Sequence, residues 1–138
     1  MPAHDDAFET ALRALRSRDC STAELAERLA RRGVGEDERT AVLERLDRAG
    51  YVDDERFACR RAAELAARGS GNALIRNDLE RRGIAAELVE AALETLEPES
   101  QRAALIVERR GHSAKTARYL AGRGFGEEAL TAVVAEGG

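Results

Sequence analysis

The acidic pair Asp53-Asp54 and two cysteines are the side chains that could first suggest a reactive or metal-binding site. Cys20 and Cys59 lie far apart and form no Cys-x-x-Cys pattern, and neither histidine stands at a metal-ligand spacing from them. The acidic pair precedes a helical pattern, where a carboxylate can accept hydrogen bonds from the free N–H groups of the first turn. We therefore expect both acids to be structural and both cysteines to be small apolar residues.

Motifs of known catalytic chemistry are missing from the sequence. It contains no phosphate-binding loop of the Walker type and no nucleophile elbow. The glycines Gly122, Gly124 and Gly126 follow a helical pattern rather than a strand, so they do not predict a dinucleotide site. We expect a protein that is not an enzyme and that uses no metal or other cofactor.

Arginine doublets recur at the ends of helical patterns, each just before a glycine: Arg31-Arg32, Arg81-Arg82 and Arg109-Arg110. One interpretation is that they complement the helix dipole and remain solvated. The other is that a repeated array aligns them to bind phosphate or an acidic protein surface. The candidate partner-binding or DNA-binding residues are Arg68, Arg76, Arg81, Arg82, Arg110, Lys115, Arg118 and Arg123.

The composition favours helices and opposes strong binding to nucleic acid. Charged residues make up 35% of the chain and aromatic residues only 4%, and there are only two prolines, which is typical of an all-helical protein. The net charge of −4 argues against tight DNA binding by bulk charge. No run approaches the roughly 18 apolar residues of a membrane span, and the polar N-terminus does not resemble a signal peptide. We expect a cytoplasmic monomer.

An internal repeat organises the chain. Each copy carries two residues one helical turn apart, both apolar in the first two copies, followed by a glycine. The three copies are Leu25-x3-Leu29-x3-Gly33, Ile75-x3-Leu79-x3-Gly83 and Thr116-x3-Leu120-x3-Gly124. They predict three tandem three-helix repeats, which would occupy residues 5–50, 51–97 and 98–136.

Capping patterns predict where several of these helices begin and end. Gly50 is expected to follow a helix end with left-handed backbone angles. Asp53 is expected to cap the next helix, with Val52 and Phe57 forming a hydrophobic staple across its start. Elsewhere the expected N-caps are Ser21, Asn72 and Ser113, and Ser21 is expected to form a capping box with Glu24.

The stretch Gly50-Tyr51-Val52-Asp53-Asp54-x-x-Phe57-Ala58 resembles the signature of RecX regulatory proteins, which reads Gly-Tyr-Leu-Asp-Asp-x-x-Phe-Ala. Two flanking segments resemble that family as well: Ser21-x-x-Glu24-Leu25-x3-Leu29-x3-Gly33 before the signature, and Gly71-x3-Ile75-x3-Leu79-x3-Gly83-Ile84 after it. The likeness covers about residues 7–97 and is weaker beyond. The signature residues, read as structural, are Gly50, Tyr51, Asp53, Asp54, Phe57, Ala58, Gly71, Leu79 and Gly83.

The resemblance implies an elongated, curved array of helices that modulates the RecA recombinase. Members of the family bind the RecA filament on single-stranded DNA. They typically inhibit its ATPase, strand-exchange and coprotease functions, which places them in DNA repair, homologous recombination and the SOS response. Some also bind DNA, which this acidic chain would do weakly, and no catalytic residues come with the family. Two alternatives stay open: a DNA-binding helical module, and a helical interaction scaffold with another partner.

Overall fold

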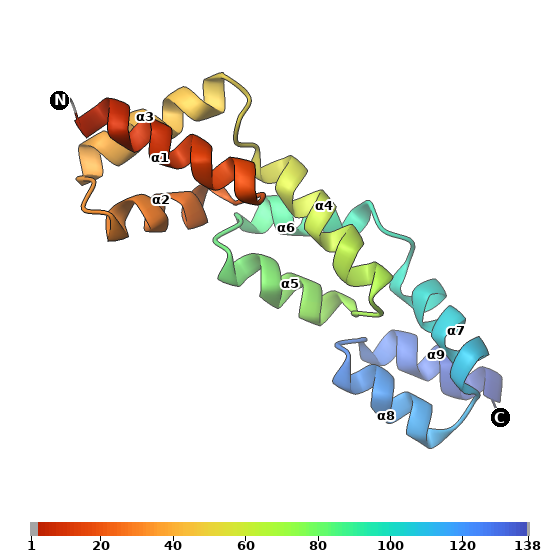
Figure 1. The fold of residues 1–138 in the computed structure, drawn as a ribbon. Helices are drawn as coiled ribbons and strands as arrows, with labels where there is room; N and C mark the ends of the chain where they lie inside the picture. The colour runs from red at the N-terminus through yellow and green to blue at the C-terminus, as the bar shows by residue number, and fades with distance from the viewer. Residues whose placement is uncertain (1–2, 138) are drawn as a thin grey trace. The chain divides into compact units, whose positions relative to one another are not determined.

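The computed structural model describes residues 3–137, and the side chains of residues 6–132 within them. This part of the chain is helical and contains no strand (Figure 1). Its nine helices are α1 (Ala3–Ser17), α2 (Thr22–Arg31), α3 (Glu36–Arg48), α4 (Asp54–Ala67), α5 (Asn72–Arg81), α6 (Ala86–Glu94), α7 (Glu99–Arg110), α8 (Ala114–Gly122) and α9 (Glu127–Gly137). The prediction of an all-helical protein is confirmed.

Two compact units divide these helices. Unit 1 comprises the chain up to residue 57 together with residues 82–84, and unit 2 comprises residues 58–81 and the chain from residue 85 onward. Helix α4 and the α5–α6 connection therefore contribute residues to both units. The division into three three-helix domains stays a prediction.

Unit 1 contains α1, α2 and α3 (Figure 1), and these helices share a hydrophobic core. Leu25 and Leu29 of α2 are fully buried, as are Val42 and Leu46 of α3. Alanines of α1 lie in the same core, and the small side chains allow that helix to approach closely. The helical spacing of these apolar residues explains why one face of each helix is buried.

Unit 2 contains two groups of buried residues. The first includes Ala58 and Ala62 of α4, Ile75 and Leu79 of α5, and Val89 of α6. The second is a core formed by α7, α8, α9 and the turn before α9, and it consists of Ala103, Val107, Leu120, Phe125 and Ala129. Thr116 is buried beside Leu120 on α8, at the position that Leu25 and Ile75 occupy in the sequence repeat.

The turn after α3 confirms the predicted role of Gly50. Gly50 has a φ of 80° and follows the helix end, where residues with a Cβ atom are strained. Its N–H donates to the carbonyl oxygen of Asp47, and the N–H of Tyr51 donates to that of Leu46. These two bonds satisfy carbonyl groups that the helix leaves without partners, in the pattern of a Schellman motif.

The start of α4 also follows the prediction. The N–H of Arg56 donates to Oδ1 of Asp53 over 3.0 Å, so Asp53 is the N-cap. Val52 and Phe57 are both buried on either side of this cap, as a hydrophobic staple requires. Ser21 and Ser113 cap α2 and α8 as predicted, and Ser21 forms its capping box with Glu24.

Within unit 1, the N-terminus of α2 forms a tertiary contact that we call the α2 joint. It consists of Ser21, Thr22, Asp54 and Arg82. Oδ1 of Asp54 accepts hydrogen bonds from the N–H and the hydroxyl of Thr22, over 2.8 and 3.0 Å. The Ser21 hydroxyl donates to the carbonyl oxygen of Arg82 over 2.6 Å. The two carboxylates of the signature are therefore both committed to helix N-termini.

Within unit 2, the N-terminus of α5 forms an equivalent contact, the α5 joint, which consists of Gly71, Asn72, Glu99 and Arg123. Oε2 of Glu99 accepts a hydrogen bond from the N–H of Asn72 over 2.6 Å, as Asp54 does from Thr22. The N–H of Gly71 donates to the carbonyl oxygen of Arg123 over 2.7 Å. Each joint thus combines an acid from the first turn of a later helix with the backbone of a later turn.

The prediction that Asn72 caps α5 is wrong. Asn72 is the first residue of the helix, and the cap position belongs to Gly71, whose carbonyl oxygen accepts from the N–H of Ile75. The Asn72 side chain is used differently, because its Oδ1 accepts a hydrogen bond from the Arg102 guanidinium. A tertiary hydrogen bond therefore uses the side chain that the local pattern assigned to capping.

Replacing Asp54 by alanine is expected to destabilise the protein by about 2 kcal/mol, because the N–H of Thr22 loses a charged acceptor at a half-buried site. Glu55→Ala is the matched control. Glu55 is also acidic and lies in the first turn of α4, but it is exposed and loses only its dipole interaction, about 0.5 kcal/mol. Urea unfolding measures both changes, and equal effects would show that the α2 joint contributes nothing specific.

Candidate functional site

The described side chains provide no metal centre. No group of three or more His, Cys, Asp or Glu residues is arranged to hold an ion in this part of the chain, and His4 lies outside it. Cys20 is buried beside the start of α2, and burial raises the pKa of its thiol. A thiol held protonated in this way is a poor nucleophile, which agrees with a packing role.

Three of the eight predicted binding residues are held in contacts within the fold. Arg76 forms a two-pronged pair with Glu90 over 2.9 and 3.1 Å, and this pair raises the pKa of Arg76. Arg82 pairs with Glu24 over 2.9 Å. Arg123 donates to the carbonyl oxygen of Arg68 and to the hydroxyl of Ser70. A partner could bind these groups only in competition with their present contacts.

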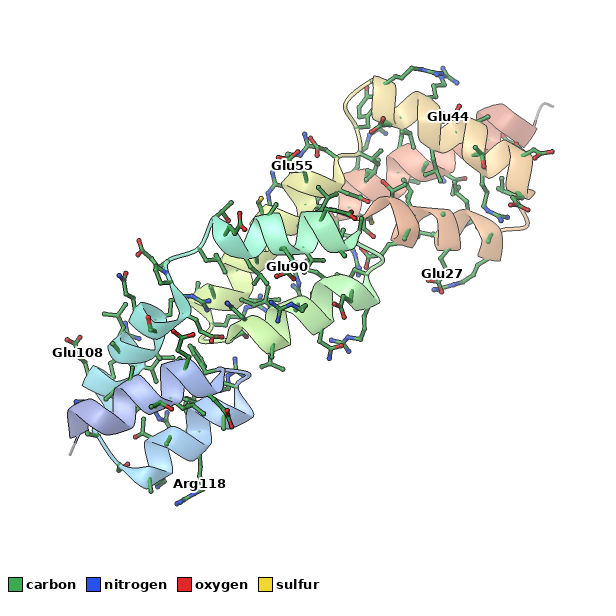
Figure 2. All side chains as sticks on the ribbon, turned by 180° about the vertical axis from the view of Figure 1, so that it is seen from behind. Glu27, Glu44, Glu55, Glu90, Glu108 and Arg118 are labelled. Atoms are coloured by element: carbon green, nitrogen blue, oxygen red, sulfur yellow. The ribbon has the colours of Figure 1, made fainter. Side chains whose placement is uncertain are left out.

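Five of the predicted residues are exposed: Arg68, Arg81, Arg110, Lys115 and Arg118. Arg81, at the end of α5, has a carboxylate oxygen of Asp78 no closer than 3.9 Å. Arg118 extends away from α8 (Figure 2). Lys115 and Arg118 can reach a partner without losing a salt bridge of the described residues, whereas Arg81 would give up its long contact with Asp78.

The residues of the sequence signature lie in structural positions. Phe57, Ala58 and Leu79 are buried, whereas Tyr51 is exposed on the turn before α4. Gly83 has a φ of 79° and lies against Ala23 of unit 1. Gly71 lies against the backbone of Gly124 in unit 2.

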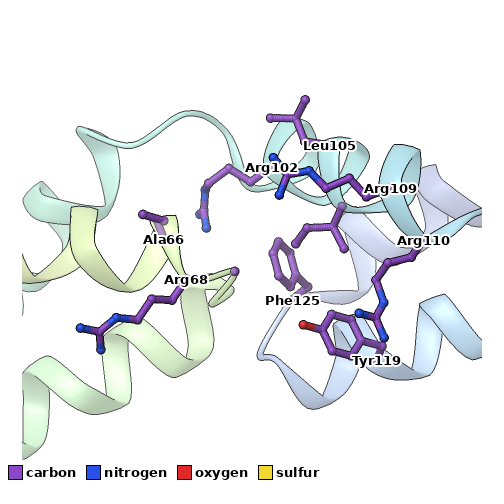
Figure 3. Close-up of a pocket in the computed structure, with 11 residues that line it drawn as sticks. Ala66, Arg68, Arg102, Leu105, Arg109, Arg110, Tyr119 and Phe125 are labelled. Atoms are coloured by element: carbon purple, nitrogen blue, oxygen red, sulfur yellow. The ribbon is translucent and has the colours of Figure 1, made fainter.

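One pocket of unit 2 brings arginines together in a way that the sequence did not predict (Figure 3). It has a volume of about 410 Å³ and lies between the end of α4, α7, Tyr119 of α8 and Phe125 in the turn before α9. Its lining includes Arg68, Arg102, Leu105, Arg109, Arg110 and Tyr119. Of the predicted set, only Arg68 and Arg110 meet here.

The pocket carries positive charge, and the acid that acts on it, Glu99 near Arg102, is not one of its lining residues. No aspartate or glutamate lines it, and the Arg110 guanidinium lies 3.6 Å from the centroid of the Tyr119 ring. Arg102 donates to the carbonyl oxygens of Glu97 and Ser70, each over 2.9 Å. Burial lowers the pKa of Arg102, because these neutral acceptors replace water only in part. The site is therefore suited to an anionic ligand.

Sequence reasoning missed Arg102 and Arg109 as members of this pocket. Arg109 belonged to a doublet, but its neighbour Arg110 was the one selected. Arg102 lies within an ordinary amphipathic helix, and its importance comes from Ser70 and Asn72, about 30 positions earlier. Only the way α7 docks on the α4–α5 turn reveals that contact.

Two family profiles match the sequence. The first three-helix domain of RecX matches residues 7–46, and the second three-helix domain of RecX matches residues 53–93. A curated relative, the regulatory protein RecX of Chromohalobacter salexigens, is 35% identical over 126 residues, which cover 85% of this chain and 83% of that protein.

Two solved structures share the fold. The crystal structure of RecX from Lactobacillus salivarius has a TM-score of 0.84 at 18% identity and covers 96% of this chain and 95% of its own. A second crystal structure, titled regulatory protein RecX, has a TM-score of 0.81 at 19% identity and covers 94% of this chain and 72% of its own.

The helix order and the matches to two three-helix domains define the class: an all-helical protein that contains small three-helix domains. Within that class, the two matched domains and the 35% identical relative decide the family. The chain belongs to the RecX family of regulatory proteins. No helix among the described residues has the length and apolar character needed to cross a membrane.

Proposed function

We propose that this chain binds the RecA recombinase on its nucleoprotein filament and inhibits ATP hydrolysis and strand exchange, within DNA repair and recombination in the cytoplasm. The observation that carries the proposal is membership of the RecX family, supported by matches to both of its three-helix domains. The relative from Chromohalobacter salexigens is named as a regulatory protein. Regulation by binding requires no catalytic group.

Repetition supports this mode of action. We propose that three three-helix repeats, over residues 5–50, 51–97 and 98–136, form an elongated array that meets more than one recombinase subunit. The contributions of linked weak contacts to affinity then add, because once the first contact has formed each further one forms at a high effective concentration. Exposed cations such as Arg81, Lys115 and Arg118 are suited to the rim of such a surface.

The test is ATP hydrolysis by RecA filaments formed on single-stranded DNA, with increasing amounts of this protein. We expect turnover to fall and to saturate as the filament is covered. The same additions to the coupling enzymes alone control for an effect on the assay. Unchanged turnover at saturating protein would contradict the proposal, whereas increased turnover would retain the partner and reverse the direction of regulation.

Charge-reversal variants test which exposed arginines contact the recombinase. The double variant Arg81→Glu with Arg118→Glu should raise the concentration needed for half-maximal inhibition by about tenfold, since each lost rim charge weakens association modestly. Arg48→Glu is the control, because Arg48 is an exposed arginine at the end of α3 that the proposal does not use. Equal effects of both variants would indicate a response to net charge only.

A further inference from the structure

The arginine-lined pocket of unit 2 is built entirely from described residues of that unit. Its volume of about 410 Å³ lies within the range of sites that bury a compact ligand or an anchoring side chain. Four arginines line it: Arg68, Arg102, Arg109 and Arg110. The Arg68 side chain extends away from Phe125 and Tyr119 (Figure 3). Such a concentration of like charge is unfavourable unless solvent or an anion compensates it.

Internal hydrogen bonds do not neutralise this charge. The acceptors for Arg102 are two backbone carbonyl oxygens and the amide oxygen of Asn72, and none of them is charged. Among the described side chains, no carboxylate pairs with Arg68, Arg109 or Arg110. A ligand carboxylate would therefore gain charge-assisted hydrogen bonds without displacing an existing ion pair.

An apolar contact lies beside these cations. Leu105 of α7 is 57% exposed, and only one other large hydrophobic side chain of the described residues, Tyr51 in unit 1, is comparably exposed. Leu105 and Ile106 line the same pocket as Arg102 and Arg109. Aliphatic surface within reach of several guanidinium groups matches a ligand that alternates apolar and acidic groups.

The pocket suits a peptide better than a nucleic acid. Binding of single-stranded nucleic acid relies on aromatic faces for base stacking. The Arg110 guanidinium already covers one face of Tyr119 at 3.6 Å, and Phe125 is only 5% exposed. The cations line one pocket rather than a groove that follows an extended backbone.

We propose that this pocket binds a short acidic segment of a partner protein, with a leucine-like side chain on Leu105 and flanking carboxylates on Arg102 and Arg109. The inference rests on the proposed function in that the segment belongs to the regulated partner. It adds the chemistry by which that partner is held: bidentate arginine–carboxylate pairs around one apolar anchor.

The experiment uses the full chain and a fluorescein-labelled peptide of sequence Glu-Glu-Leu-Asp-Glu-Leu-Glu, followed by fluorescence anisotropy. Micromolar binding is expected. Arg109→Glu should weaken it at least about tenfold, because one bidentate pair is lost and a repulsion is added. Arg48→Glu, the same change at an exposed arginine in the last turn of α3, should leave binding within about twofold of the original.

Two further measurements test the anchor and the ligand class. A peptide with serine in place of both leucines should bind at least about fivefold more weakly, as should the original peptide with Leu105→Ser protein. Oligothymidylate should neither bind tightly nor displace the peptide. Displacement by oligothymidylate that Arg109→Glu abolishes would overturn the proposal and assign the pocket to nucleic acid, and equal losses in Arg109→Glu and Arg48→Glu would overturn it as well.

The two proposals can fail separately. Failure to bind the peptide while the filament ATPase still falls would reject the pocket and retain the recombinase as partner. Peptide binding that depends on Arg109, together with an unchanged filament ATPase, would retain the pocket and reject that partner. Circular dichroism of each variant confirms that the helices are intact before either result is interpreted.

Discussion

Replacing Gly71 by alanine is expected to destabilise the protein by about 3 kcal/mol, from overpacking and from lost hydrogen bonds. A Cβ atom at this position would lie 2.5 Å from the carbonyl oxygen of Gly124, and closer still to backbone atoms of Gly124 and Phe125. Backbone atoms cannot rotate away, so the turn before α9 must move. That movement separates the N–H of Gly71 from its acceptor on Arg123, and the N–H of Ala73 from its acceptor on Gly124.

Gly122→Ala is the matched control for this variant. Gly122 is the last residue of α8, and nothing lies within 4 Å of the Cβ that alanine would add there. Because alanine loses less backbone entropy than glycine in a helix, this change should stabilise by about 0.5 kcal/mol. Urea unfolding of both variants gives the comparison. A Gly71→Ala protein as stable as the original would mean that the α5 joint does not hold the close backbone contact described here.

Removing the carboxylate of Asp78 is expected to cost about 3 kcal/mol, as for other ion pairs that are buried and lose one partner. Asp78 lies on α5 with its side chain only 11% exposed, and both of its oxygens accept from the Arg61 guanidinium over 3.0 Å. Asp78→Asn keeps the shape and removes the charge, and therefore leaves the half-buried cation of Arg61 without its main counterion.

Glu90→Gln tests the same change at an exposed pair. Glu90 binds Arg76 in the same two-pronged manner, but the two side chains are 55% and 40% exposed, so solvent screens the interaction. The expected loss is below about 1 kcal/mol. The pair lowers the pKa of Glu90, so its small contribution is present above the ordinary glutamate pKa and lost as the pH falls. Equal losses for Asp78→Asn and Glu90→Gln at neutral pH would show that burial does not decide the outcome.

Local patterns predicted the turns and caps well, because the interactions that fix them lie within a few residues. Gly50 ends α3 and Asp53 caps α4 as expected, since both roles depend on groups no more than four positions away. The repeated glycines Gly33, Gly83 and Gly124 all follow a helix with positive φ. Membership of the RecX family was also predicted from the residues that form these turns, above all the stretch from Gly50 to Ala58.

Long-range contacts could not be read in the same way. Asp54 was expected to be structural, but its partner Thr22 is 32 positions earlier. Asn72 was assigned to capping, whereas Glu99 and Arg102 engage its backbone and side chain. The arginine pocket likewise depends on where α7 lies against the α4–α5 turn. Sequence periodicity fixes which face of a helix is apolar, but it does not fix which polar groups from distant helices meet.

The hydrogen bonds of Glu99 can form only after most of the chain has been synthesised. Oε2 accepts from the N–H of Asn72 at the start of α5, and Oε1 accepts from the N–H of Gly126 just before α9. Domains form from the N-terminus as the chain leaves the ribosome. The α2 joint can close once residue 82 has emerged, whereas the α5 joint must wait for residue 123 and the second hydrogen bond of Glu99 for residue 126. A nascent chain halted between residues 82 and 123 would hold the first joint complete, with the N-terminus of α5 still lacking its contacts from Arg123 and Gly124.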